Sequence, residues 1–281
     1  GMLLLDHELP VAALRTLQGI GTAVILPTSM TLSARLAPAR QATALGAMGA
    51  LNSLALAVGP PIGLALYATH GAIGLFLPAL AASVLGLMAV ARVPRVGATH
   101  EQVSGFGYDR RWTALIAANG LAAVYFGGII AYLPLYLRHL NGPNAGIFFT
   151  ADALGVLLLR IPTGLLVDRR GALLPKILGL AITLPGIAAL ALPPSIFALA
   201  LSGAMTGIGA GLFITGVYAD LAARSTDANR GTALSLSSAS FGGAIFVGGA
   251  ISGLLIGPGG FGAVLIFGAV TCLAALPLAL R

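Results

Sequence analysis

The sequence predicts an all-α membrane protein with about nine transmembrane helices, and its composition and hydropathy pattern support this prediction. Of its 281 residues, 58% are hydrophobic and 8% are charged, whereas a soluble domain carries about 25% charged residues. The apolar runs are long enough to form spanning helices, since a hydrocarbon core of about 30 Å needs about 20 residues per helix. They lack the alternation over roughly 10 residues that is typical of a membrane β-barrel. A soluble enzyme is therefore excluded.

The nine spans follow from the positions of charged loops and turn signals along the chain. Three long stretches contain no Asp, Glu, Lys or Arg, and each is long enough for two spans. Gly and Pro near the middle of each stretch mark a turn, at 69–71, 193–195 and 257–260, because these residues end helices. The expected spans are 9–34, 41–68, 71–91, 113–137, 144–167, 172–192, 195–219, 230–256 and 259–280.

The basic residues are distributed unevenly over the two sides that nine spans define. Of fifteen Lys and Arg residues, twelve fall in loops of one side, one on the other side and two within spans. Cytoplasmic loops collect Lys and Arg, so we expect that side, with the C-terminus, to face the cytoplasm. The protein is then a multi-pass protein of the cell membrane, in a bacterium the inner membrane. The net charge of +7 reflects this topology, and we expect no binding to nucleic acid.

Residues 92–112 form the longest polar connection and are the expected cytoplasmic linker between two membrane domains. The linker separates a partial N-terminal bundle of three spans, residues 1–91, from a C-terminal six-helix bundle, residues 113–281. A shift of 190 residues aligns the chain with itself without gaps, and both copies have the same membrane orientation. Parallel repeats of this kind build the two halves of one large class of transporters. If the halves are equivalent, about three helices are missing before residue 1.

The loop after the fifth expected span contains the pattern Gly164-Leu-Leu-Val-Asp168-Arg169-Arg170-Gly171. This pattern resembles the loop signature of the major facilitator superfamily, in which Gly, three residues, Asp, a base, one residue and Gly follow one another. Two bases usually come next in that signature, whereas this chain has Ala and Leu.

Two further patterns resemble helices of the same superfamily. The segment from Arg15 to Gly21 resembles its Arg-containing fourth helix. The glycine-rich fifth helix that is associated with antiporters is matched by Gly46, Gly59, Pro60 and Gly63. The resemblance covers the whole chain, from the fourth to the twelfth helix of that family, and implies helical bundles of the major-facilitator type.

The resemblance implies a secondary active transporter that works by alternating access between two bundles. Its antiporter and efflux features favour proton-coupled export of a small organic solute, with the solute, protons and the lipid bilayer as partners. The alternatives are an uptake symporter or uniporter, and an inactive transporter fragment. The sequence has no catalytic motif and no metal-ligand spacing, so we expect no enzymatic activity, no metal and no cofactor.

The resemblance also implies a gate on the cytoplasmic side. Asp168 would lie at the start of the helix that begins near Arg40, where free N–H groups and the helix dipole favour an anion. It would lock the two halves together while the transporter faces outward. We further expect Arg169 or Arg170 to contact Asp220, which ends the seventh span on the same side. The alternative is that these charges are solvated and only set the topology.

Three ionisable residues lie within spans, where each costs about 2.5–3.5 kcal/mol at the bilayer centre: Arg15, Asp152 and Arg160. Asp152 is about 12 Å deep, at 1.5 Å per residue from the start of its span. We expect it to face the interior between the halves and to carry the proton, since desolvation brings proton exchange by a carboxyl group toward neutral pH. Alternatively, Asp152 is a neutral structural group, Arg15 modulates a carboxylate elsewhere, and Arg160 reaches toward the cytoplasmic interface.

A polar face on the fourth expected span is a candidate wall of the substrate cavity. Tyr125, Tyr132 and Tyr136 are spaced i, i+7 and i+11 and therefore share one helix face, with Asn119 nearer the cytoplasm. Aromatic rings with hydroxyl groups suit a ligand that is partly apolar and partly polar. The alternative is that the tyrosines are core or membrane-interface residues.

Overall fold

The computed structural model describes residues 8–92, 107–226 and 228–281. These residues form helices joined by short turns, with no strand among them, so the predicted all-α class is confirmed. The helices are α1 (Glu8–Leu36), α2 (Gln41–Ala91), α3 (Thr113–His139), α4 (Gly146–Arg170), α5 (Leu173–Ala189), α6 (Ile196–Ala223) and α7 (Arg230–Ala279), with two short 3-10 helices, η2 (Pro38–Arg40) and η3 (Arg110–Trp112).

α2 and α7 are each divided by a sharp bend at a glycine. With 51 and 50 residues, each would be about 75 Å long as a straight helix, more than twice the hydrocarbon thickness of about 30 Å. The bends occur at Gly71 and Gly260, both with a φ of 63°, which glycine adopts without steric cost. Both glycines lie in turns that the sequence predicts. Divided at these bends, the described part of the chain forms nine helical segments.

Several helices are long and apolar enough to cross a membrane. Five qualify as they stand, namely Thr69–Ala91, Arg110–His139, Gly146–Arg170, Ile196–Ala223 and Arg230–Ala279, and the bent pair Leu17–Leu36 and Pro38–Ala55 would add a sixth. α7 counts as one of the five despite its bend. α5 is not among them because it has 17 residues, although it is apolar. Large apolar side chains such as Leu158, Phe246 and Leu254 point outward and are more than half exposed. Such a surface suits lipid rather than water.

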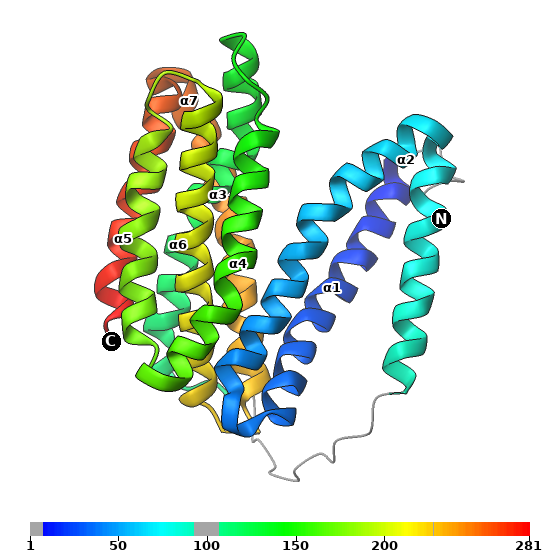
Figure 1. Ribbon diagram of the computed structural model, residues 1–281, viewed down its shortest axis with the longest axis vertical. Coiled ribbons are helices and arrows are strands. Elements are labelled where there is room, and N and C mark those ends of the chain that lie inside the picture. Colours follow the sequence, from blue (N-terminus) through cyan, green and yellow to red (C-terminus); the bar gives the residue numbers. More distant parts are fainter. Residues whose placement is uncertain (1–7, 93–106, 227) are drawn as a thin grey trace.

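α3 to α7 pack into a bundle, and α1 with the first part of α2 forms a separate pair beside it (Figure 1). Within the bundle α3 packs against α7, and α6 packs against both α4 and α5. The pair contacts the bundle where α2 meets α4 and where α1 meets α7. In Figure 1 the two groups of helices meet at the lower end and diverge toward the upper end.

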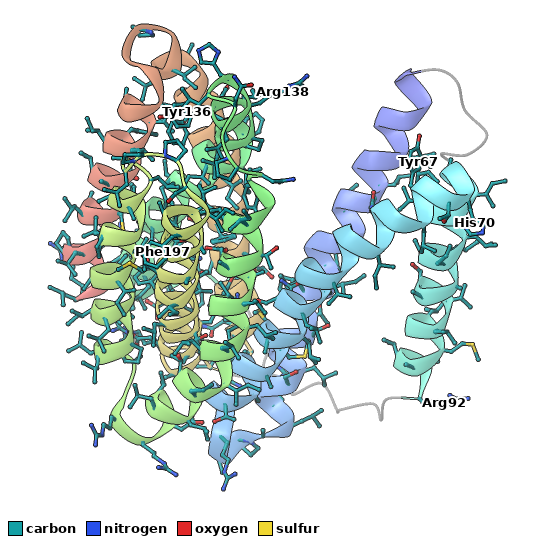
Figure 2. The ribbon with its side chains drawn as sticks, turned by 45° about the horizontal axis from the view of Figure 1, so that its top comes forward. Tyr67, His70, Arg92, Tyr136, Arg138 and Phe197 are labelled. Carbon is teal, nitrogen blue, oxygen red and sulfur yellow. The ribbon has the colours of Figure 1, made fainter. Side chains whose placement is uncertain are left out.

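The turns that join α1 to α2, α4 to α5 and α6 to α7 lie together at the lower end in Figure 1. We call this end the basic end, because those turns and the adjoining helix ends carry Arg35, Arg40, Arg169, Arg170, Arg224 and Arg230. Arg138 lies at the opposite end of the molecule, as Figure 2 shows. This grouping agrees with the charge asymmetry of the sequence.

The second part of α2 stands apart from the other helices. Its segment Thr69–Ala91 is apolar and has no buried residue. Figure 2 shows His70 near one end of this segment and Arg92 at the other. The expected linker at 92–112 lies mostly outside the described residues, and the division into a three-span and a six-span domain stays a prediction.

Candidate functional site

The carboxylate of Asp168 binds the first turn of α2. Its Oδ1 accepts a hydrogen bond from the Ala42 amide (3.1 Å), and its Oδ2 accepts bonds from the amide (3.0 Å) and hydroxyl (2.5 Å) of Thr43. Arg40, which precedes α2, forms no side-chain cap. A carboxylate from α4 therefore satisfies amide groups that a helix start leaves free, and it does so at the positive end of the helix dipole. The predicted contact is present.

Two glycines let α2 and α4 approach closely enough for this contact. A Cβ atom on Gly164 would lie 2.6 Å from the Ala42 carbonyl oxygen, and one on Gly46 would overlap the Arg160 carbonyl oxygen. Side chains at these positions would push the helices apart, as at other close helix crossings in membranes. One glycine comes from the loop signature and the other from the glycine-rich helix, so these two sequence patterns meet in one interface.

The rest of the expected helix-packing motif does not take part in this interface. Gly59 has no neighbour within 4 Å of a Cβ position among the described residues, and Gly63 faces Leu75 of its own helix α2. The side chain of Pro60 lies outside the described part of the chain. The expectation of close packing between helices is therefore met at Gly46. At Gly63 a Cβ atom would lie 3.1 Å from Leu75 in the segment after the bend at Gly71, whereas Gly59 has no such neighbour.

The expected contact of Arg169 or Arg170 with Asp220 is wrong. Both arginines are exposed. Asp220 instead binds the buried Lys176 of α5 (Nζ–Oδ2 2.6 Å) and Arg224, one turn later on α6 (Nε–Oδ1 2.7 Å). Both carboxylate oxygens are thereby occupied, so this acid joins α5 to α6 inside the bundle and does not reach α2. Gly171, with a φ of 80°, ends α4 before the turn to α5.

We expect Lys176→Met to lower the thermal stability of the protein markedly. Lys176 is 2% exposed and Asp220 is 14% exposed. Removing one partner of a buried pair costs about 3–5 kcal/mol when the other charge is left unpaired, and the loss here should be smaller because Arg224 still pairs with Asp220. Thermal unfolding of the purified protein in detergent measures the effect. Arg111→Met is the matched control, because its pair with Asp109 is 3.9 Å long and the arginine is 79% exposed, where a pair is worth below about 1 kcal/mol. Equal losses in both variants would contradict the assignment.

Asp152 is buried in the interface between α4 and α6. Its Oδ1 accepts a hydrogen bond from the Thr206 hydroxyl (2.9 Å), whose oxygen also lies within 3.0–3.1 Å of the carbonyl groups of Ser202 and Gly203. A hydroxyl has one proton to donate, so Asp152 shares this donor with two carbonyl groups. Among the described residues Asp152 has no salt bridge. It is a buried acid with little to stabilise a negative charge.

The structure corrects the expected orientation of Asp152. We expected this acid to face the interior between the halves, but it faces α6 within the bundle. The residues of α4 that meet α2 are Arg160, Gly164 and Asp168. Gly164 is the middle one of these three, and the other two lie about 40° to either side of it around α4. Asp152 is twelve residues before Gly164 and is rotated about 120° from it. That rotation turns it toward Thr206.

Arg160 lies at the interface between α2 and α4 and is 8% exposed. Its guanidinium covers Gly49 of α2, where a Cβ atom would overlap it. Tyr218 of α6 is close enough to interact with it electrostatically. Its Nε is buried and forms no hydrogen bond within the described residues. Arg160 therefore reaches α2 rather than the membrane interface.

Near Arg160 is a neutral polar cluster that sequence reasoning found only in part. Asn119 donates from Nδ2 to the carbonyl (3.1 Å) and hydroxyl (3.0 Å) oxygens of Ser237, and the hydroxyls of Tyr218 and Ser238 are 3.1 Å apart. Asn119 was an expected site residue, whereas Tyr218 and the two serines were not. They carry no charge, so nothing in their spans distinguishes them from ordinary polar residues of a helix interface.

The comparisons with known proteins agree with the family resemblance of the sequence. A family model described as the Major Facilitator Superfamily matches residues 1–143 and 115–281. The chain belongs to the major facilitator superfamily. A transporter of that type from Salmonella typhimurium strain LT2, itself described as uncharacterised, is 29% identical over 254 residues, which are 84% of this chain and 63% of that protein. The chain thus spans less than two thirds of the length of this relative. It is a multi-pass membrane protein from a family of transporters.

The tyrosines of the expected cavity wall on α3 pack against other helices. Tyr125 is buried, the Tyr132 hydroxyl lies against Gly253 of α7, and Tyr136 stacks on Phe261 with ring centroids 4.3 Å apart. In the described state this face of α3 therefore helps to hold α3 to α7. The side chain of Arg15 lies outside the described part of the chain.

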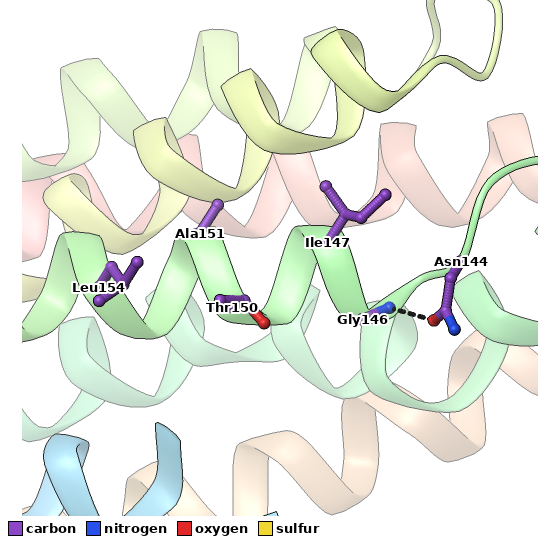
Figure 3. Close-up of a pocket in the computed structure, with 6 residues that line it drawn as sticks. All are labelled: Asn144, Gly146, Ile147, Thr150, Ala151 and Leu154. Carbon is purple, nitrogen blue, oxygen red and sulfur yellow. Dashed lines mark hydrogen bonds between the residues drawn. The ribbon is translucent and has the colours of Figure 1, made fainter. Parts of the chain in front are cut away.

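An open hollow of about 530 Å³ lies on α4 toward the end opposite the basic end. Figure 3 shows its lining, in which the Asn144 side chain accepts a hydrogen bond from the Gly146 amide. The lining is Asn144, Gly146, Ile147, Thr150, Ala151 and Leu154, and contains none of the expected site residues. No group of three His, Cys, Asp or Glu residues in the described ranges could hold a metal ion.

Proposed function

We propose that the protein exports a small organic solute in exchange for protons, by alternating access between its two groups of helices. The observation that supports proton coupling is Asp152, a buried acid with one shared hydrogen-bond donor and no salt bridge to any described residue. Intramembrane acids of this kind form proton relays in pumps and transporters. Export is supported by the antiporter-like glycine-rich helix, whose Gly46 contributes to the contact between α2 and α4.

The contact between Asp168 and α2 is the proposed gate. It closes the basic end in the described conformation, in which the two groups of helices diverge toward the other end (Figure 1). Opening the basic end requires α2 to leave α4, which breaks the three hydrogen bonds of Asp168. Because this contact is built from a carboxylate and helix amides, it can break and re-form without repacking an apolar core.

Everted membrane vesicles that contain the full-length protein test the direction and the coupling. In everted vesicles the cytoplasmic side faces the medium, and respiration acidifies the interior. An exchanger that exports solute accumulates it in these vesicles and releases part of the pH gradient, which a fluorescent amine reports for each member of a solute panel. Entry that needs no gradient and stops when the solute concentrations are equal on both sides would indicate a uniporter. Accumulation only in right-side-out vesicles would indicate an uptake symporter.

We also propose that the basic end faces the cytoplasm of a bacterial inner membrane. The free cysteine, Cys272, is fully buried, so introduced cysteines can be labelled above a low background. A membrane-impermeant thiol reagent added to spheroplasts should label Arg138→Cys and leave Arg170→Cys unlabelled until the membrane is broken. The opposite labelling pattern would show that the basic end faces the periplasm. The proposed gate would then close the periplasmic side.

A further inference from the structure

Arg160 is a buried cation without an anionic partner in the described part of the chain. It is 8% exposed, its Nε forms no hydrogen bond, and it forms no salt bridge with any residue that the structure describes. A charged group inside a helical membrane bundle is costly and is normally paired with an opposite charge. The interface between α2 and α4 therefore holds a positive charge whose counter-charge is not supplied by the described residues.

The acids on neighbouring elements are occupied or distant. Asp168, on the same helix, is bound to the start of α2, and Asp220 of α6 is bound to Lys176 and Arg224. Asp152 is about 12 Å away along α4, at 1.5 Å per residue over eight residues, and faces Thr206. The groups closest to Arg160 are neutral: Gly49 of α2 and the hydroxyl of Tyr218.

We propose that Arg160 binds an anionic group of the transported solute, a carboxylate or a phosphate. A guanidinium suits this task because its planar array of donors binds both oxygens of such a group at once. In the described conformation α2 covers the cation at Gly49. When the basic end opens, α2 leaves α4 and the cation faces the passage between the two groups of helices, with the Tyr218 hydroxyl as a second donor. This inference rests on the proposed transport function and adds the substrate class.

Equilibrium binding to the full-length protein in lipid nanodiscs tests the proposal without a proton gradient. The probes are three pairs of an anion and its neutral counterpart: benzoate and benzamide, gluconate and glucose, and glycerol 3-phosphate and glycerol. Dissociation constants follow from the rise in unfolding temperature with probe concentration. At least one anion should bind where its neutral partner does not, and the pair that responds distinguishes a carboxylate from a phosphate.

Variants at Arg160 and Gly49 make the test specific. Arg160→Gln should weaken binding of that anion about tenfold to a hundredfold, since charge-assisted bonds contribute effects of this size, and Arg160→Lys should restore part of the affinity. Gly49→Ala should tighten binding, because the added methyl overlaps the guanidinium and displaces it from its covered place against α2. Gly242→Ala is the control, because a Cβ there has no neighbour within 4 Å. A gain in affinity cannot result from misfolding.

The outcomes separate this inference from the proposed function. If anion binding depends on Arg160 but the proton gradient has no effect on transport, the anion site is supported and proton coupling is rejected. Gradient-driven transport that persists in Arg160→Gln would overturn the inference and retain the function. The inference is also overturned if no anion binds better than its neutral partner, or if Arg160→Gln binds the anion as well as the unchanged protein does.

Discussion

Asp152→Asn is expected to abolish proton-driven transport while solute exchange persists. The amide has the size of the carboxyl group and can still accept the hydrogen bond from Thr206, but it cannot bind and release a proton. Net transport in everted vesicles under a pH gradient measures the driven process. Counterflow, in which labelled solute exchanges for unlabelled solute without a gradient, measures binding and conformational exchange.

A matched acid separates this effect from a general loss of charge. Asp109, at the N-cap of η3, is paired loosely with the exposed Arg111, so Asp109→Asn should leave both assays close to those of the unchanged protein. If Asp152→Asn retains full gradient-driven transport, Asp152 is a structural acid and the proton is carried elsewhere. Loss of counterflow together with driven transport would indicate that the variant is misfolded or cannot bind solute.

Asp168→Asn is expected to shift the protein toward conformations in which the basic end is open. The amide keeps one acceptor oxygen for the start of α2, but it loses the charge and the second acceptor. Hydrogen bonds to a charged group contribute about 1.5–3 kcal/mol, so the ratio of closed to open molecules should fall by at least about tenfold, at 1.4 kcal/mol per factor of ten. Net transport should fall because closure of the basic end becomes incomplete.

The rate of alkylation at Ala42→Cys measures this shift. Ala42 is 3% exposed beneath the contact, so N-ethylmaleimide should modify a cysteine there slowly in the unchanged background. In the Asp168→Asn background the rate should rise about tenfold, in proportion to the open population. Asp109→Asn is again the control. If the alkylation rate and transport are both unchanged in Asp168→Asn, the charges of Asp168 and its neighbours only set the membrane topology and do not form a gate.

The contact of Asp168 with the start of α2 was predicted through the family resemblance, and the parts of the signature that carries it are local. Asp168 follows Gly164 by four residues, one helical turn, so a close crossing at the glycine brings the carboxylate to the partner helix. The start of α2 follows Pro38, and Pro is common in the first turn of a helix. Turns at Gly71 and Gly260 were predictable for a similar reason, because glycine alone adopts their backbone conformation at no cost.

The contacts that the sequence predicted wrongly depend on which helix faces which. Asp220 has Arg224 one turn later on its own helix, and the buried Lys176 comes close only because α5 packs against α6. The direction of Asp152 depends on the rotation of α4, which is set where Arg160, Gly164 and Asp168 meet α2. Single-sequence hydropathy gives the position of a span along the chain and says little about its rotation.

The central claim is that proton binding and the Asp168 contact control access of solute to the passage between the two groups of helices. The distance between these groups across the basic end, measured in lipid nanodiscs, tests this claim most directly. Spin labels at Leu36→Cys and Leu173→Cys, both exposed positions near this end, would report it in a background with Cys272 replaced by alanine. Two populations of distance are predicted, with a ratio that changes between acidic and alkaline buffer. In Asp152→Asn that ratio should become independent of pH, and in Asp168→Asn the longer distance should dominate. A single distance that is the same at every pH and in all three proteins would contradict the account.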